Sequence, residues 1–179
     1  LDANSHNNVA NTPLQQPLSP KVVRNSSNDE LMIDCAFTAG RKATDLELES
    51  LTWQELCSFF SKPLEVADCT LAEYQAASNS HRAEMKDGLG VVPAKLRDPS
   101  LGRKTENIES VSMIVLDIDC GMSLEEAQKI MAGTESVIHT TFSHTPEHPK
   151  LRVITPLKKA VTTLHAKAIF HQMQERFDG

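Results

Sequence analysis

Hydrophobic and polar positions follow strand-like or helix-like patterns in separate segments of the chain. The longest apolar run, residues 111–119, predicts a strand buried on both faces in the middle of a sheet. Shorter apolar runs predict strands over residues 31–37, 136–142 and 151–156. Residues 78–108 contain several Gly and Pro residues and are predicted to be rich in loops.

Three pairs of residues have the spacing of helix capping boxes. They are Thr52 with Glu55, Thr70 with Glu73, and Ser123 with Glu126. In such a box the hydroxyl accepts a hydrogen bond from the first turn, and the acid reaches back to the capping residue. The helices predicted from these boxes, and from the helical spacing of apolar residues near the end of the chain, cover residues 53–60, 70–77, 123–132 and 161–177.

The order of elements after residue 110 is strand, helix, strand, strand, helix. This order predicts most of a split βαβ unit, with a ferredoxin-like or RRM-like (RNA-recognition-motif-like) sheet. We therefore expect an α+β fold with an additional N-terminal α/β unit. Residues 1–28 are rich in Asn, Ser, Gln and Pro and are expected to form a disordered tail before a domain over residues 29–179. Because the chain starts at Leu1 and ends directly after a helical pattern, we expect a domain cut from a larger protein.

The composition is that of a soluble globular protein, with 40% hydrophobic and 23% charged residues. No apolar run has the length of a membrane span, and the first 30 residues lack a signal sequence, so we expect no membrane contact and a cytoplasmic location. The net charge of −6 argues against simple binding of duplex nucleic acid. The four cysteines form no CxxC pair and are expected to be buried or free thiols.

The sequence Asp117-Ile118-Asp119 ends the longest apolar run. Alternation along a strand places Asp117 and Asp119 on one face and Ile118 on the other. Two neighbouring carboxylates repel each other, and a divalent cation such as Mg²⁺ or Mn²⁺ removes that repulsion while keeping positions open for phosphate oxygens. Gly121 would let a triphosphate approach the backbone. The alternative is an acidic strand end that simply runs into solvent.

A second polar group lies in residues 140–154, where one strand ends, a Pro-containing turn follows and another strand begins. Hydroxyl, imidazole and guanidinium groups suit triphosphate binding, and Ser143, His144 and Arg152 are the candidates, with Thr141 beside them. The alternative is a polar hairpin loop. His139, inside the preceding strand, is expected to be a core or cross-strand residue.

The loop-rich stretch before the acidic strand carries basic residues, among them Lys86, Arg103 and Lys104, with Arg97 between them. They are candidates for contacts with the phosphates of a template or primer strand. A solvated loop is the alternative interpretation.

From Thr52 to Gly179, the sequence resembles the primase-polymerase domain of the archaeo-eukaryotic primase superfamily, in the form found in phage and plasmid replication proteins. The matching segments are residues 53–56, 86–88, 114–121 and 143–154. The resemblance implies the fold of that superfamily and template-directed synthesis of a primer or of DNA from nucleoside triphosphates. It also implies Mg²⁺ or Mn²⁺, a single-stranded DNA template and, in many relatives, a helicase domain or subunit.

The motifs of the superfamily map onto this sequence with one departure. Asp117 and Asp119 match the metal-binding acids, and Asp178, after Phe177, matches a third acid, which could equally lie beyond the end of the chain. The serine-x-histidine motif is altered, because Ser143 and His144 are adjacent and Arg152 stands where relatives place the histidine on the strand. The nucleotide contact is therefore Ser143 with His144, or Arg152.

Three other functions use comparable sheets or chemistry. A rolling-circle replication endonuclease needs a His-hydrophobic-His pair, which is absent, and a helical tyrosine, whereas the only tyrosine, Tyr74, precedes the expected sheet core. A nucleotidyl cyclase-like domain needs a glycine-rich hairpin, which is absent. A non-catalytic nucleic-acid-binding or assembly module would expose aromatic residues on its central strands, and none occurs on the strand over residues 111–119.

Overall fold

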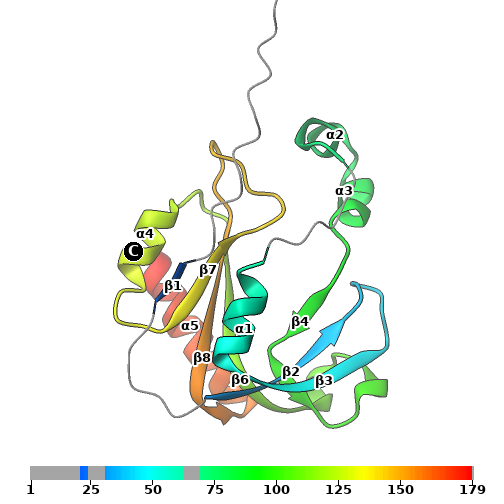
Figure 1. Cartoon of the computed structure of the whole chain (residues 1–179), viewed down its shortest axis with the longest axis vertical. Helices are drawn as coiled ribbons and strands as arrows, with labels where there is room; N and C mark the ends of the chain where they lie inside the picture. The colour runs from blue at the N-terminus through cyan, green and yellow to red at the C-terminus, as the bar shows by residue number, and fades with distance from the viewer. Residues whose placement is uncertain (1–20, 24–30, 63–68, 179) are drawn as a thin grey trace, which may run out of the picture.

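The computed structural model describes residues 21–23, 31–62 and 69–178, which form an α+β fold with two antiparallel sheets (Figure 1). The larger sheet has the strand order β1-β7-β8-β6-β5, and the smaller has the order β3-β2-β4. The strands are β1 (Lys21–Val23), β2 (Met32–Thr38), β3 (Leu46–Thr52), β4 (Gly90–Val92), β5 (Ala94–Leu96), β6 (Ile108–Ile118), β7 (Ser136–Thr140) and β8 (Leu151–Val161). The helices are α1 (Trp53–Phe60), α2 (Leu71–Ala76), α3 (Asn79–Met85), α4 (Leu124–Ile130) and α5 (Thr163–Asp178), with short 3₁₀ turns at Pro99–Leu101 and Thr105–Asn107.

The predicted split βαβ unit is present in the larger sheet. Strand β8 pairs antiparallel with both β6 and β7, so β6 and β7 run parallel with β8 between them. Helix α4 connects these two parallel strands. Strand β5 pairs with the free side of β6, and β1 pairs with the free side of β7.

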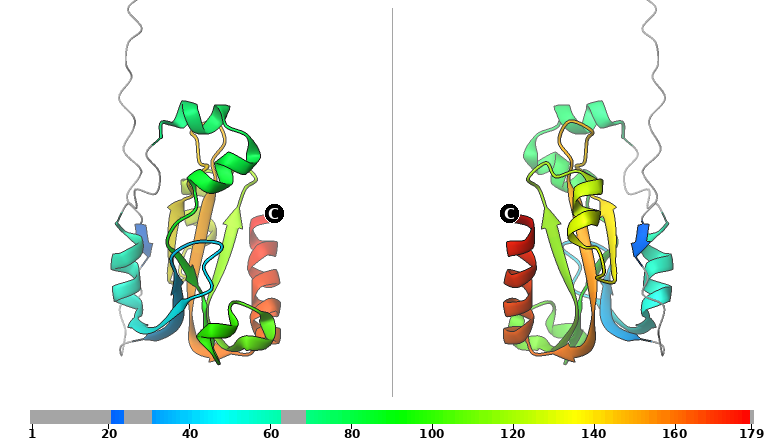
Figure 2. Two further views of the ribbon diagram at one scale, coloured as in Figure 1. Left: turned by 90° about the vertical axis from the view of Figure 1, so that its right-hand side faces the viewer. Right: turned by 90° about the vertical axis from the view of Figure 1, so that its left-hand side faces the viewer.

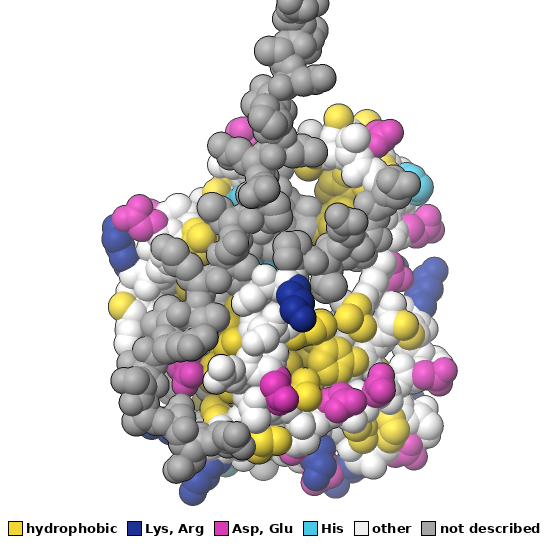
Figure 3. All heavy atoms as spheres, viewed as in Figure 1, with side chains coloured by type: hydrophobic (Ala, Val, Ile, Leu, Met, Phe, Trp, Pro, Cys, Tyr) yellow, Lys and Arg dark blue, Asp and Glu magenta, His cyan; other side chains and the backbone are white. Residues whose placement is uncertain are grey.

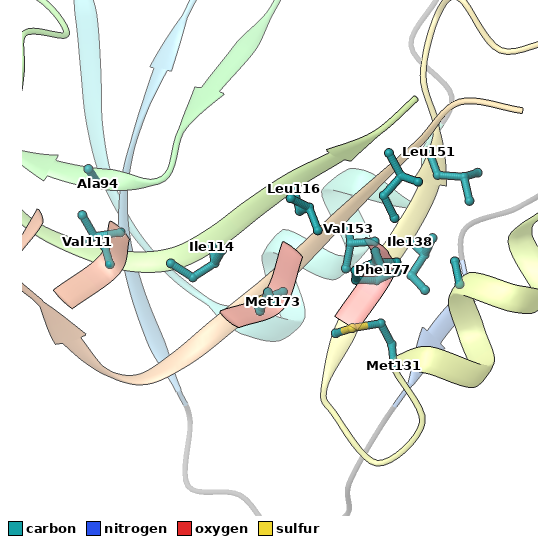
Figure 4. Close-up of a cluster of buried hydrophobic side chains, with 13 residues drawn as sticks. Ala94, Val111, Ile114, Leu116, Met131, Ile138, Leu151, Val153, Met173 and Phe177 are labelled. Atoms are coloured by element: carbon teal, nitrogen blue, oxygen red, sulfur yellow. The ribbon is translucent and has the colours of Figure 1, made fainter. Parts of the chain in front are cut away.

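One face of the larger sheet is covered by α4 and α5. Alternate residues of β6, namely Ile114, Leu116 and Ile118, pack in a buried cluster with Met173 and Phe177 of α5 (Figure 4). Side chains from α4, β7 and β8 complete the same cluster. Burial of this apolar surface is the main term that holds the helices on the sheet.

The opposite face of the larger sheet carries α1 and the smaller sheet, so that α1 and α5 lie on opposite sides of the strands (Figure 2). Met113 of β6 and Ile154 of β8 are buried there against Trp53 and Leu56 of α1. The α1 capping box forms as predicted: the Thr52 hydroxyl accepts from the Glu55 backbone N–H, and the Glu55 carboxylate accepts from the Thr52 backbone N–H. On this face, near the end of β6 and the start of β8, the side chains of Asp117 and Arg152 are partly exposed, 51% and 42%.

Several short elements differ from the sequence prediction. Residues 78–108 were predicted to be rich in loops, but they contain α3, β4, β5 and the two 3₁₀ turns. These elements are too short for their periodicity to be recognised between Gly and Pro residues. Strand β3 lies outside the segments expected to be strands, although its alternation of Leu and Glu is a strand signal. Residues 21–23 were expected in the disordered tail, and they form β1 instead; residues 1–20 and 24–28 lie outside the described part.

The smaller sheet has an outer surface with apolar and acidic areas. Hydrophobic side chains gather over β2 and β4, and acidic side chains follow the edge strand β3 (Figure 3). Charged side chains on an edge strand oppose pairing with other chains. Among the described residues, no helix is both long enough and apolar enough to cross a membrane.

The cysteines are expected to differ strongly in reactivity. Burial raises the pKa of the Cys35 thiol to about 11, with added repulsion from Glu49 and Asp34, whereas Cys120 is exposed. Since the thiolate is the reactive form, iodoacetamide at pH 8 should label Cys120 well before Cys35. Peptide mass spectrometry measures this order, and the unfolded protein, in which the two should react at similar rates, is the control. Equal labelling of the folded protein would show that the buried cluster of β2 and α1 around Cys35 opens readily.

Candidate active site

Three polar residues form a row across the larger sheet, on the face that carries α1. Asp117 of β6 lies opposite Arg152 of β8, and Arg152 lies opposite His139 of β7. Arg152 donates two hydrogen bonds to Asp117, from Nε to Oδ1 at 2.6 Å and from Nη2 to Oδ2 at 2.9 Å. This two-point geometry fixes the guanidinium plane in the middle of the row.

Asp119 directly follows the last residue of β6, Ile118. Its Oδ1 is 3.4 Å from Nζ of Lys150, the residue just before β8. Between the two acids, Ile118 is buried on the opposite face with the α5 cluster. Each acid at the end of β6 is therefore paired with a cation from the start of β8.

The charges in the row are set by these contacts. The hydrogen bonds from Arg152 lower the pKa of Asp117 against the opposing effect of burial, and the same contact raises the pKa of Arg152. Burial, with a contribution from Arg152, lowers the pKa of His139. At neutral pH the row thus consists of a carboxylate, a guanidinium and a neutral imidazole.

His139 has a place in the site that the sequence did not reveal. It is a cross-strand residue, as expected, but its ring also stacks on Phe60 of α1, with ring centroids 6.2 Å apart and planes 15° apart. Its Nδ1 lies 2.9 Å from the Thr140 carbonyl oxygen, which matches an Nδ1–H donor. Only the register of β7 against β8 places this ring beside Arg152, and the sequence alone does not give that register.

The turn between β7 and β8 brings the other predicted contacts to the same end of the sheet. The Thr141 backbone N–H donates to the Lys150 carbonyl at 3.0 Å, closing the turn. His144 braces it, because its Nδ1 accepts a hydrogen bond from the Lys150 backbone N–H at 3.2 Å. The Ser143 hydroxyl is 2.8 Å from the Tyr74 hydroxyl of α2. We call residues 141–150 the β7–β8 turn.

Comparison of the sequence with the profiles of known families identifies the family to which the chain belongs. The profile of the VapE N-terminal domain matches residues 20–178. The chain belongs to the VapE N-terminal domain family. This family is associated with phage and plasmid replication. Searches of curated proteins and of solved structures found no match.

Asp178 does not join the acids of this VapE N-terminal domain. It ends α5, where Phe177 is buried against the sheet face opposite to Asp117 and Asp119. Packing of Phe177 holds the end of α5 on that side. Among the described residues, no group of three or more His, Cys, Asp or Glu side chains could hold a metal ion. The predicted set of Asp117, Asp119 and Asp178 is therefore not assembled.

The predicted basic contacts of the VapE N-terminal domain are also dispersed. Arg103 and Lys104 precede β6, whereas the acids lie at its other end, so a strand of 11 residues separates them. At about 3.3 Å per residue this is roughly 30 Å. Arg103 donates instead to the Arg41 carbonyl in the β2–β3 loop, and Lys86 caps the end of α3.

Gly121 has a backbone reason to be glycine. At the turn after β6, its φ of 83° lies in the left-handed region, which residues other than glycine rarely adopt. Room for a triphosphate is therefore not needed to explain this residue.

Proposed function

We propose that this domain is a nucleotidyltransferase that joins nucleotides on a single-stranded DNA template, as a primase or polymerase in phage or plasmid replication. The observation that carries the proposal is that Asp117, near the end of β6, and Asp119, just after it, pair with Arg152 and Lys150 at the start of β8. Carboxylates beside cations on one sheet face can hold a metal and its triphosphate together. Family membership supports a role in replication.

The two acids suit Mg²⁺ or Mn²⁺ by ligand type, since both metals prefer carboxylate oxygens. In the structure the acids are occupied by Arg152 and Lys150, which would have to release them. The carboxylate side chains are half or more exposed, 51% for Asp117 and 64% for Asp119. Ion pairs at such exposure contribute about 1 kcal/mol or less, so an exchange of partners costs little. A bound metal would neutralise triphosphate charge and lower the pKa of the attacking 3′-hydroxyl.

The cations have an obvious second partner in the substrate. A guanidinium that fits a carboxylate with two parallel hydrogen bonds fits a phosphate in the same way. Arg152 and Lys150 can therefore move from the acids to the phosphates as the nucleotide binds, with Ser143 adding a hydroxyl. The ion pairs of the free protein hold these side chains close to their positions for catalysis, which reduces the entropy lost on binding.

A non-catalytic nucleic-acid-binding or assembly module is the second candidate. The observation that favours it is the lack of a third acid near Asp117 and Asp119 in the described residues. The exposed aromatics of an RRM-like binding sheet are missing, however, because β6 and β8 contain no aromatic residue. A rolling-circle endonuclease is disfavoured further, because Tyr74 is buried and bonded to Ser143.

The test is synthesis itself. The full chain is incubated with single-stranded DNA, labelled ribo- or deoxynucleoside triphosphates and Mg²⁺ or Mn²⁺, with EDTA as the metal-free control. Metal-dependent oligonucleotide products support the proposal. Binding of single-stranded DNA without any product, and unaffected by EDTA, would instead identify the non-catalytic module.

Changing Arg152 to lysine is expected to weaken nucleotide binding. Lysine keeps the charge but loses the two-point geometry, so the KM for nucleotide should rise about tenfold, equivalent to about 1.4 kcal/mol. Steady-state incorporation measures KM, and Lys159→Arg, an exposed change farther along β8, is the matched control. An unchanged KM in Arg152→Lys would mean that Arg152 does not contribute to nucleotide binding and serves only in its ion pair with Asp117.

A further inference from the structure

The only tyrosine of the chain joins the α2–α3 segment to the β7–β8 turn. Tyr74 lies 69 residues before Ser143, yet their hydroxyl oxygens are 2.8 Å apart. The Tyr74 ring also packs edge-on against Phe142, with centroids 5.0 Å apart and an interplanar angle of 75°. Helices α2 and α3 lie at the same end of the molecule as this turn (Figures 1 and 2).

Arg82 of α3 fixes the other side of this contact. Its guanidinium carbon lies 5.9 Å from the centre of the Tyr74 ring, within the range of a cation–π interaction. Its Nε and Nη2 donate to the carbonyls of Ala77 and Gln75, at 2.8 Å and 3.0 Å. The phenol is therefore held by Phe142 and Arg82, and it is 8% exposed.

The direction of the hydroxyl hydrogen bond decides what Ser143 can do. A serine hydroxyl has a single proton to donate, and a phosphate oxygen is an acceptor. If Ser143 donated to Tyr74, it would have no proton left for a phosphate. A phenol is more acidic than an aliphatic hydroxyl and is therefore the better donor of the two.

We propose that Tyr74 is a positioning residue for nucleotide binding: its hydroxyl donates to Ser143 Oγ, so that the Ser143 proton points to a triphosphate oxygen. This inference rests on the proposed function and adds to it a residue outside the sheet. Successive hydrogen bonds polarise one another, so donation from Tyr74 makes Ser143 a stronger donor. The ring contacts hold the β7–β8 turn in place, and the hydroxyl sets the direction of the Ser143 proton.

Tyr74→Phe separates these two roles, because it keeps the ring and removes only the hydroxyl. Loss of the hydrogen bond that orients Ser143 predicts a threefold to tenfold rise in KM for nucleotide, with kcat within about twofold. The dissociation constant for dATP or ATP with Mg²⁺, measured by calorimetry, should rise by the same factor. A purely structural role would lower Tm and would not raise KM selectively.

The Ser143→Ala background completes the test. If Tyr74 acts through Ser143, Tyr74→Phe should have no further effect on KM once the serine hydroxyl is gone. An unchanged KM and dissociation constant in Tyr74→Phe, or an effect that adds in full to that of Ser143→Ala, overturns the inference while the proposed function stands. A wild-type protein that neither binds nor incorporates nucleotide overturns both.

Discussion

Asp117→Asn is expected to reduce metal-dependent nucleotide incorporation by a factor on the order of 10²–10³. Asparagine has nearly the same shape, and it keeps an oxygen for Arg152, so the sheet should remain intact. It lacks the negative charge that a divalent ion requires, and Arg152 would then face a neutral partner. Single-turnover incorporation with a bound primer and template measures the loss at the chemical step.

Glu109→Gln is the matched control for this change. Glu109 is also an acid of β6 in an ion pair, with its Oε1 3.0 Å from Lys95 Nζ, but it lies at the other end of the strand. Both variants should lose at most about 1 kcal/mol of unfolding free energy, because both pairs are exposed. Equal activity in the two variants would show that Asp117 has no role in nucleotide transfer and would favour the non-catalytic module.

Leu151→Ala is expected to lower the free energy of unfolding by about 2–5 kcal/mol. Leu151 has no exposed surface, and it packs in the cluster between the larger sheet and helices α4 and α5. Truncation would leave a cavity next to Ile118, which is its cross-strand partner in β6. This loss is a large part of the 5–15 kcal/mol that stabilises an ordinary domain. Urea denaturation followed by circular dichroism measures it.

The control for this prediction is Leu164→Ala. Leu164 is a leucine of α5 with 74% of its surface exposed, and its truncation should change stability by less than about 0.5 kcal/mol. A similar small cost for Leu151→Ala would mean that the start of β8 is loosely held. Arg152 and Lys150 would then have no rigid support.

Much of the fold follows from local sequence signals. The apolar run before Asp117 predicted a buried central strand, and the structure places β6 there with partners on both sides. The capping boxes at Thr52, Thr70 and Ser123 predicted three helix starts correctly. These signals are readable because the interacting groups are only three residues apart.

Contacts between distant segments explain what the sequence did not show. The pairing of Asp117 with Arg152 depends on the register of β6 against β8, which apolar patterning alone leaves open. Asp178, after Phe177, matches the third acid of the superfamily, but Phe177 is buried on the other face of the sheet and Asp178 ends α5 there. The hydrogen bond between Tyr74 and Ser143 joins residues 69 positions apart, and no local sequence pattern predicts it.

The split arrangement of the larger sheet has a consequence for folding. Strands β7 and β8 are consecutive in the chain and are joined by the ten residues of the β7–β8 turn, so the entropy of closing that loop is modest and the hairpin can form early. Strand β6 must reach β8 across α4 and β7, and this non-local step is slower. The hairpin would therefore place Arg152 and Lys150 before β6 docks, and these two cations would attract Asp117 and Asp119 as that strand pairs with β8.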